Sequence, residues 1–304
     1  MRFNPTSTKT IRLRTPQREQ RGVTLIELLV GLSIGLMVIG VAMGALMVSR
    51  GVSGTVSDVS TIQQQAAYAM RVIGQQIRQA GSLYLNPDPL GGAMANPLNP
   101  VIFETDAQDT GSAPISFSQA ETIGAPSATE VTSTFRRYLD AVYVSANPTS
   151  LVRNCLGGPE DSAANATQQA MVSAFALHPA TATLRCTGNG VGPQPIVQNV
   201  ADFQVRYMQQ LPIPTGTSVR YLAHDEVTDW RSVQGVEVCL VLYGTEVIDM
   251  PAPANAADPQ GTYVGCDGNR VDMTSLASPR TRRMHMVFRN VFQLRSQGLL
   301  RVDS

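Results

Sequence analysis

Lysine is almost absent from this chain of 304 residues, in which Lys9 is the only one. Phosphate-binding P-loops and Schiff-base enzymes require a lysine amine, so both are excluded beyond residue 22. Basic charge is also scarce there, because 17 arginines stand against 22 acidic residues, a net charge of −5. Non-specific binding of nucleic acid needs a positive surface, so no nucleic-acid partner is predicted.

Clusters of catalytic or metal-binding residues are lacking as well. The three histidines are scattered, and no two cysteines have the Cys-x-x-Cys spacing that is typical of zinc sites. His285 falls on the outward phase of the last strand pattern, and His178 and His224 are isolated. The sequence therefore predicts a protein that is not an enzyme and has no cofactor and no metal.

Two glycine-containing runs resemble binding motifs only in part. The run from Gly188 to Gly192 spaces its glycines wrongly for a nucleotide fingerprint, so we expect a turn. Asp267, Asn269 and Asp272 carry oxygens that suit calcium, but the twelve-residue calcium pattern is missing. A hairpin turn beside Cys266 is the preferred interpretation, and a calcium site is the alternative.

One long apolar run indicates a membrane helix. The 21 residues from Leu28 to Val48 carry no charge, which is enough to cross a hydrocarbon core of roughly 30 Å. Six basic residues precede this run and only Arg50 follows closely, which predicts a cytoplasmic N-terminus and an exported body. Secretory signals have shorter apolar regions, of about 7 to 15 residues.

The segment before the apolar run has a distinctive order, Arg21-Gly22-Val23-Thr24-Leu25-Ile26-Glu27. It resembles the class III signal of type IV pilins and of type II secretion pseudopilins. The resemblance implies that the prepilin peptidase cuts between Gly22 and Val23 and methylates the new N-terminus at Val23, where the family usually has phenylalanine. Residues 1–22 are then a leader peptide, and residues 23–54 a transmembrane assembly helix.

Glu27 is an acid within apolar sequence, where a charge costs about 2.5–3.5 kcal/mol. No basic side chain lies nearby in the mature helix, so we expect its partner to be the α-amino group of Val23 on a neighbouring subunit. Such a pair would fix the axial register of packed helices. The alternative is a carboxylate that reaches the membrane interface and has no role.

Small residues recur along the same helix. Gly31 with Gly35, and Gly40 with Gly44, have the G-x-x-x-G spacing that allows close packing of membrane helices. Glycine that is merely tolerated in a lipid-facing helix is an equally good interpretation.

Residues 55–81 are predicted to form an amphipathic helix, which Gly81 ends. Its apolar positions recur about every 3.5 residues: Val56, Val59, Ile62, Ala66, Met70, Ile73 and Ile77. The other face is rich in glutamine and includes Gln75 and Gln76. We expect the apolar stripe to pack on the protein's own sheet.

Residues 82–304 are predicted to form a β-rich head domain. Residues 86–100 contain four prolines and two adjacent glycines, which predicts a connecting loop. Four segments have strand patterns, at 137–144, 203–207, 236–242 and 284–294. The expected fold class is α+β, a long N-terminal helix packed on an antiparallel sheet.

All four cysteines lie in the exported part, where disulfides form. Of the three connectivities we prefer the sequential one, because it closes two moderate loops: Cys155 with Cys186 and Cys239 with Cys266. Each closure would stabilise the head by roughly 3–4 kcal/mol in the chain-entropy model.

Three further segments, residues 69–81, 200–207 and 288–295, resemble the PilW family of minor pilins. The resemblance implies an inner-membrane protein with a periplasmic head that moves to the pilus tip at the cell surface on assembly. The implied partners are other minor pilins, the major pilin, the assembly platform and a tip adhesin, in a fibre that serves adhesion or twitching motility. The alternative is a J-type minor pseudopilin of type II secretion, which has a similar helix and sheet.

Overall fold

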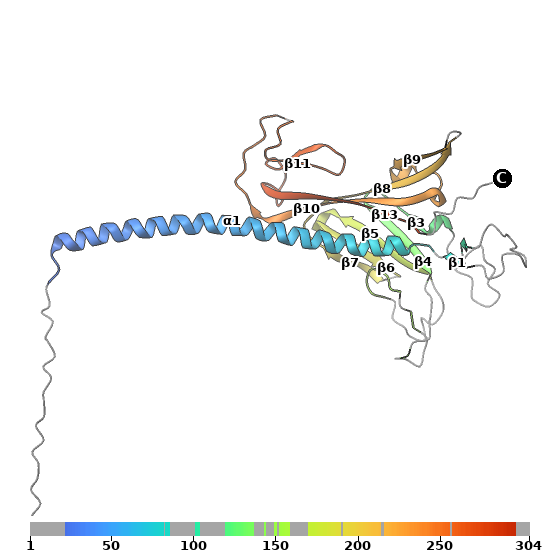
Figure 1. The fold of residues 1–304 in the computed structure, drawn as a ribbon, viewed down its shortest axis with the longest axis horizontal. Coiled ribbons are helices and arrows are strands. Elements are labelled where there is room, and N and C mark those ends of the chain that lie inside the picture. Colours follow the sequence, from blue (N-terminus) through green and yellow to red (C-terminus); the bar gives the residue numbers. More distant parts are fainter. Residues whose placement is uncertain are drawn as a thin grey trace, which may run out of the picture. The chain divides into compact units, whose positions relative to one another are not determined.

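The computed structural model describes residues 22–81, 83–85, 101–103, 119–136, 143, 149–150, 152–158, 170–189, 191–213, 216–255 and 257–295 (Figure 1). The chain divides into two compact units between Ser53 and Gly54, and each is described by itself. Residues 1–21 of the predicted leader and the proline-rich stretch at 86–100 lie outside the described residues.

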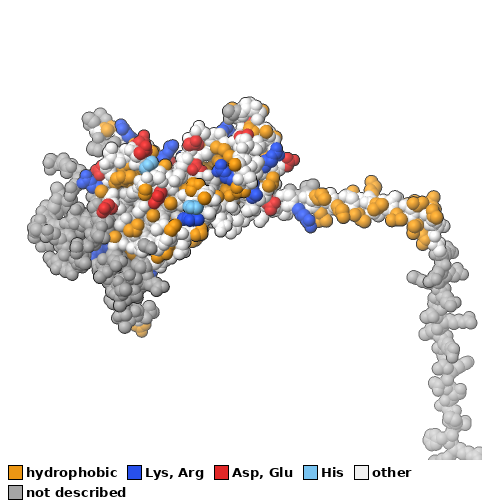
Figure 2. Space-filling view, turned by 180° about the vertical axis from the view of Figure 1, so that it is seen from behind, with side chains coloured by type: hydrophobic (Ala, Val, Ile, Leu, Met, Phe, Trp, Pro, Cys, Tyr) orange, Lys and Arg blue, Asp and Glu red, His pale blue; other side chains and the backbone are white. Residues whose placement is uncertain are grey.

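The first unit contains the N-terminal part of helix α1, which runs from Leu25 to Gln79. Within the described part of the chain, α1 is the one helix that is long and apolar enough to cross a membrane. The mean hydropathy of its most apolar 18 residues is 2.4. Figure 2 shows hydrophobic side chains along this part of the helix. Its large side chains, from Leu25 to Met47, are exposed, as a lipid-facing segment requires.

The remainder of α1 belongs to the second unit and buries one face. Five small or branched apolar side chains lie at helical spacing on that face: Ile62, Ala66, Ala69, Ile73 and Ile77. The predicted stripe is therefore confirmed from Ile62 onward. It is wrong at Val56, which is 63% exposed, because the buried residue in that turn is Asp58. It is also wrong for Gln76, which is buried and not on the polar face.

The head contains two larger antiparallel sheets. One has the order β3-β4-β5-β6-β7, with strands Ile123–Gly124, Glu130–Arg136, Ala170–His178, Thr183–Gly188 and Val191–Val197. The other has the order β13-β10-β8-β9, with strands Arg283–Gln293, Val233–Val247, Val200–Ile213 and Gly216–Leu222. Together with α1 they give the α+β architecture that the sequence predicted.

Two short hairpins and four 3-10 turns complete the described head. The hairpins are β1-β2 (Leu83–Leu85 and Val101–Phe103) and β11-β12 (Thr262–Val264 and Arg270–Asp272). The turns are η2 (Gln119–Glu121), η4 (Pro179–Thr181), η5 (His224–Glu226) and η6 (Trp230–Ser232).

Three of the four predicted strands are present, as parts of β8, β10 and β13. The fourth, at 137–144, lies outside the described residues except for Tyr143, and the neighbouring strand β4 ends at Arg136. The expectation of a single sheet of four strands is wrong, because the five-stranded sheet was missed entirely. Its strands are rich in alanine, serine, threonine and proline, which weakens the alternation of apolar and polar residues.

One hydrophobic core joins α1 to both larger sheets. Its largest fully buried side chains include Phe175 and Leu184 of the five-stranded sheet and Phe203, Tyr207 and Leu240 of the four-stranded one. Phe292 of β13 lies so close to Gly74 of α1 that a Cβ at Gly74 would overlap its ring. Glycine at this position therefore permits the close approach of helix and strand.

A second, smaller apolar cluster lies on the opposite face of the four-stranded sheet, around Cys239, Val241 and Cys266. His285 belongs to this face, and it is buried between two tyrosines. Its ring stacks on Tyr263 at 4.7 Å and on Tyr243 at 5.8 Å, measured between centroids. His285 does lie on the face of β13 that points away from the main core, as the strand pattern predicted. It is nevertheless buried, because Tyr263 of β11 covers this face.

Candidate functional site

The start of α1 forms a reciprocal cap between Thr24 and Glu27. The backbone N–H and the hydroxyl of Thr24 donate to Glu27 Oε2 at 3.2 and 3.0 Å, and the N–H of Glu27 donates to Thr24 Oγ1 at 3.3 Å. The N–H of Leu28 donates to the carbonyl of Thr24 at 3.1 Å, which makes Thr24 the N-cap. This capping box satisfies donors that the first helical turn would otherwise leave free.

The cap gives Glu27 a polar partner within its own chain, and its pairing with the α-amino group of a neighbouring subunit stays a prediction. Its carboxylate already accepts two hydrogen bonds from Thr24, and it lies at the positive end of the helix dipole, which favours negative charge. The Thr-x-x-Glu spacing is the sequence signal that sequence analysis overlooked. In the described residues both bonds use Oε2, and no hydrogen bond to Oε1 is present.

The paired glycines lie on an open helix surface. A Cβ added at Gly31, Gly35, Gly40 or Gly44 would meet no atom within 4 Å. Gly31 and Gly35 line a shallow apolar groove with Leu28, Leu32, Leu36 and Ile39. The geometry leaves room for a helix to approach this face, and the packing role of the four glycines stays a prediction.

Asp58 makes a polar contact between α1 and the end of β10. Its carboxylate accepts hydrogen bonds from the hydroxyl of Thr245 at 2.8 Å and from the N–H of Glu246 at 2.7 Å. Burial works to raise the pKa of Asp58, but these hydrogen bonds and the charge of Arg283 outweigh it and lower that pKa. Arg283 also donates to the carbonyl of Gly244 at 3.2 Å, so the end of β10 is held from two sides.

Gln76 makes a polar contact near the other end of the buried helix face. Its Oε1 accepts from the hydroxyl of Ser173 at 2.8 Å, and its Nε2 donates to the carbonyl of Arg153 at 3.3 Å. The N–H of Cys155 in turn donates to Ser173 Oγ at 3.0 Å. Gln76 therefore ties α1 both to β5 and to the segment that carries a disulfide.

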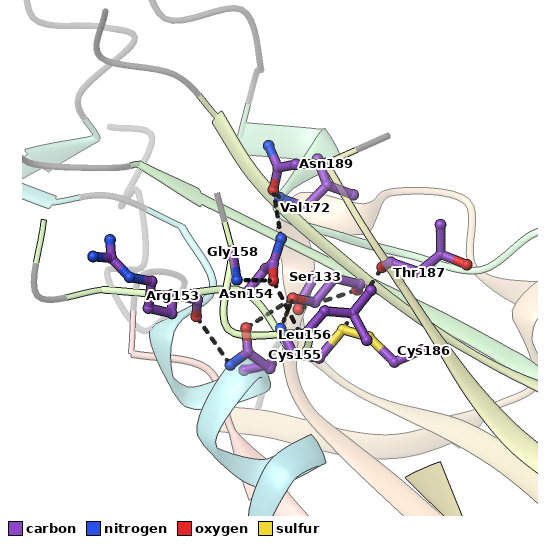
Figure 3. The surroundings of a disulfide bond; sticks show 12 residues. Ser133, Arg153, Asn154, Cys155, Leu156, Gly158, Val172, Cys186, Thr187 and Asn189 are labelled. Atoms are coloured by element: carbon purple, nitrogen blue, oxygen red, sulfur yellow. Dashed lines mark hydrogen bonds between the residues drawn. A yellow bond between two sulfur atoms is a disulfide. The ribbon is translucent and has the colours of Figure 1, made fainter. Parts of the chain in front are cut away.

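The two disulfides follow the sequential pairing that sequence analysis preferred. Cys155 joins Cys186 of β6, and Cys239 of β10 joins Cys266 beside the β11-β12 hairpin. The segment around Cys155 is ordered further by Asn154, whose Oδ1 accepts from the N–H groups of Leu156 and Gly158, both at 3.0 Å (Figure 3). Arg289 donates to the carbonyl of Cys266 at 2.9 Å.

Each of the three histidines makes a polar contact with a residue close to it in the sequence. His178 Nδ1 lies 2.9 Å from the Thr181 hydroxyl, and His224 lies 3.8 Å from the carboxylate of Asp225. Burial lowers the pKa of His285 to about 4; the hydrogen bond to the carbonyl of Arg283 opposes this change. Across the described ranges, no three His, Cys, Asp or Glu side chains gather as a metal site would require.

Asp267, Asn269 and Asp272, the residues of the alternative calcium site, lie in the β11-β12 hairpin. Asp267 accepts from the backbone N–H and side-chain amide of Asn269, at 2.9 and 2.8 Å. Asp272 accepts from the N–H and hydroxyl of Thr274, at 2.8 and 2.7 Å. These bonds organise the two turns, which is the structural role that sequence analysis preferred. In the run at 188–192, Gly188 ends β6 and Val191 begins β7.

Two protein-family models match separate parts of the chain. Residues 17–43 match the family model described as the prokaryotic N-terminal methylation motif, and residues 162–296 match the one described as Type IV Pilus-assembly protein W, or PilW. The chain thus carries a PilW-like region in its head, behind an N-terminal methylation motif. The first match includes Gly22, Val23 and Glu27, and the second includes strands β5 to β13 of the head.

Among solved structures, the chain is similar to a type IV-like pilin from Thermus thermophilus, at 12% identity and a TM-score of 0.35. That match covers 78% of this chain and 96% of the other. No curated protein matches the chain. The methylation motif and the apolar helix α1 support anchoring of the chain in a membrane, with a soluble head.

Proposed function

We propose that the protein is a minor pilin, a low-abundance subunit that primes assembly of a type IV pilus. The observation that carries the proposal is the combination, in one chain, of a PilW domain in the head and a methylation motif at the start of an exposed apolar helix. The head carries out no reaction in this proposal. It provides lateral contacts to other subunits.

Maturation is the first proposed step. The prepilin peptidase cleaves between Gly22 and Val23 and methylates the amino group of Val23, on the cytoplasmic side of the inner membrane. Both residues precede the first helical residue, Leu25, so the scissile bond lies in non-helical backbone next to the helix. Cleavage removes the basic leader and keeps the apolar helix on the mature protein, which stays a single-pass membrane protein with a periplasmic head.

Assembly through Glu27 is the second proposed step. The new amino group of Val23 is one residue from Thr24, so the cleaved chain carries a positive charge beside its own capping box. We propose that Glu27 keeps its Thr24 cap through Oε2 and uses Oε1 to meet the Val23 amino group of a neighbouring subunit. The cap prearranges the carboxylate, and the ion pair then fixes the register between helices.

The proposed partners follow from this assembly. They are the prepilin peptidase, the inner-membrane assembly platform, other minor pilins, the major pilin and a tip adhesin. The helix contacts would involve the open faces of Gly31 and Gly35 and of Gly40 and Gly44, where small residues allow close approach.

Fibre composition and secretion test the function. Deletion of the gene should abolish or sharply reduce surface pili, and mass spectrometry should detect the protein in sheared fibres as a minor component. Secretion of type II substrates should be unchanged in the same strain. Loss of secretion with normal piliation would contradict the proposal and establish the J-type pseudopilin instead.

A further inference from the structure

The free edges of the two larger sheets are protected unequally in the described part of the head. β3 has only two residues, and β7 contains Pro193 and Pro195, which have no N–H to donate. On β13, the N–H of Val291 donates to the side chain of Asn290 at 2.9 Å. Short edges, proline and capped N–H groups all discourage pairing with another chain. β9 has seven residues and no proline, and its one charged side chain is Arg220.

β9 presents unpaired backbone groups on its outer side. Among the described residues β9 pairs only with β8, in a hairpin whose two-residue connection is flanked by Ile213 and Gly216. In a two-residue hairpin, the two residues that flank the connection, here Ile213 and Gly216, hydrogen-bond to each other. Along an antiparallel strand, every second residue is hydrogen-bonded to the partner strand in this way, and the residues between them are not. Thr217, Val219 and Tyr221 therefore direct their N–H and C=O groups away from β8.

The same residues place apolar side chains at the free edge. Val219 and Tyr221 are 56% and 49% exposed, and they lie on one face of the sheet because they are two residues apart. A β-branched and an aromatic residue on an unprotected edge favour strand pairing.

The sequence of β9 is complementary to itself in one antiparallel register. Its first three residues are small and its last three are large, with Val219 between them. A two-fold axis at Val219 sets each large residue opposite a small one of the second copy: Leu222 with Gly216, Tyr221 with Thr217, and Arg220 with Ser218. An axis at Arg220 would place two guanidinium groups opposite each other, which is destabilising.

We propose that β9 is the docking edge for a second copy of this chain, paired antiparallel about Val219 so that the two four-stranded sheets join into one. Thr217, Val219 and Tyr221 exchange backbone hydrogen bonds across the axis, and the two Val219 side chains pack together. Only three residues of each strand exchange hydrogen bonds, so the contact is weak in dilute solution. Confinement of both copies to one membrane raises their local concentration and favours the pair.

Cysteine cross-linking in the full-length protein, in its own membrane, tests the proposal. All four native cysteines are in disulfides, so Val219→Cys adds the single free thiol. In a hydrogen-bonded antiparallel pair the Cα atoms are about 5.5 Å apart, within the range that a disulfide spans. Mild oxidation should give a dimer of twice the monomer mass that reduction reverses. Val191→Cys on the proline-containing edge β7, where Val191 is 46% exposed, is the matched control and should give at least about fivefold less dimer.

A second pair of variants tests the register. Chains with Ser218→Cys and chains with Arg220→Cys, tagged differently and expressed together, should form the mixed dimer in clear excess over dimers of either variant with itself. Equal cross-linking of Val219→Cys and Val191→Cys would overturn the proposal, as would no dimer at Val219. If Val219→Cys is cross-linked to a different protein, that protein and not a second copy occupies the edge, and the proposal is overturned. Equal yields of the mixed dimer and of the dimers of each variant with itself would refute the axis at Val219.

Discussion

The carboxylate of Asp58 accepts a hydrogen bond of 2.8 Å from the hydroxyl of Thr245, which lies 187 residues later in the chain. Together with the N–H of Glu246, this hydroxyl replaces the water that a buried carboxylate loses. The contact joins the first buried turn of the head's helix to the end of β10. It therefore sets where the helix becomes part of the head.

Asp58→Asn should destabilise the head. An asparagine at this position would turn an N–H donor toward the donors of Thr245 or Glu246, and loss of a buried charged hydrogen bond costs about 1.5–3 kcal/mol. Urea unfolding of the detergent-solubilised protein should show a lower midpoint at pH 7. The matched control is Asp249→Asn, because Asp249 is exposed and lies 3.5 Å from Arg282 in a surface ion pair, so its midpoint should change little.

The Asp58 contact should also weaken in acid. Its pKa is lower in the folded protein than in the unfolded chain, so its stabilisation is complete above the unfolded pKa of about 3.9 and is lost as pH falls through the folded pKa. The difference in stability between the parent and Asp58→Asn should therefore shrink below about pH 4. A difference that stays constant from pH 7 to pH 3 would contradict this assignment.

Gln76→Ala should destabilise the head by about 1–3 kcal/mol, because Ser173 and the carbonyl of Arg153 would lose their buried partner. Gln75→Ala is the matched control, since Gln75 is the same residue type one position earlier and is exposed. Its effect should stay within about 0.5 kcal/mol. Comparable effects of the two substitutions in urea unfolding would show that the Gln76 hydrogen bonds contribute nothing specific.

His285 should make the head less stable as the medium is acidified below neutral pH. Its pKa is about 4 in the folded state against about 6.5 in the unfolded chain, so the unfolded chain binds a proton first. Stability should fall as pH decreases from about 7 toward 4. Phenylalanine can keep the stacking on Tyr263 but cannot be protonated.

The measurement is the change in unfolding midpoint between pH 7.5 and pH 5, in the parent and in His285→Phe. The parent should lose more stability than the variant over this interval. Glu130 and Asp202, whose pKa values burial raises, act in the opposite direction, but they contribute equally to both proteins. Identical pH responses would argue against a buried neutral histidine.

The charge and the capping role of Glu27 can be separated. Glutamine at this position keeps the capping box but has no charge, whereas Thr24→Ala removes the hydroxyl of the cap and keeps the carboxylate. We expect Glu27→Gln to be inserted and cleaved but excluded from fibres, and Thr24→Ala to be incorporated. Immunoblots of sheared fibres and of membranes measure both. Normal incorporation of Glu27→Gln would remove the proposed ion pair.

Sequence reasoning predicted the elements that obey a strong periodicity. The helix stripe from Ile62 to Ile77 and the alternation of Val236, Val238, Leu240 and Leu242 both face the core as expected. It missed the strands of the five-stranded sheet, where Ser133 and Ser173 occupy buried positions that normally hold apolar residues. Their hydroxyls are satisfied by partners far away in the sequence, and no local pattern reveals such partners.

Sequence reasoning singled out some residues of the candidate site and missed others. The positions of Gly22, Val23 and Glu27 follow from local spacing, and the Thr24 cap was readable from the same spacing. Asp58 and Gln76 were out of reach, because an acid and an amide on a helix are normally exposed. Only the tertiary contacts with Thr245 and Ser173 explain why these two are buried.

The central claim is that a methylated amino group at Val23 exists in the mature protein and meets Glu27 of a neighbouring subunit. The most direct test is the mass of the N-terminal peptide of the protein isolated from its native membrane. The account predicts a chain that begins at methylated Val23, and a Gly22 substitution that retains residues 1–22. A native chain that begins at Met1, or anywhere beyond Val48, would contradict the account.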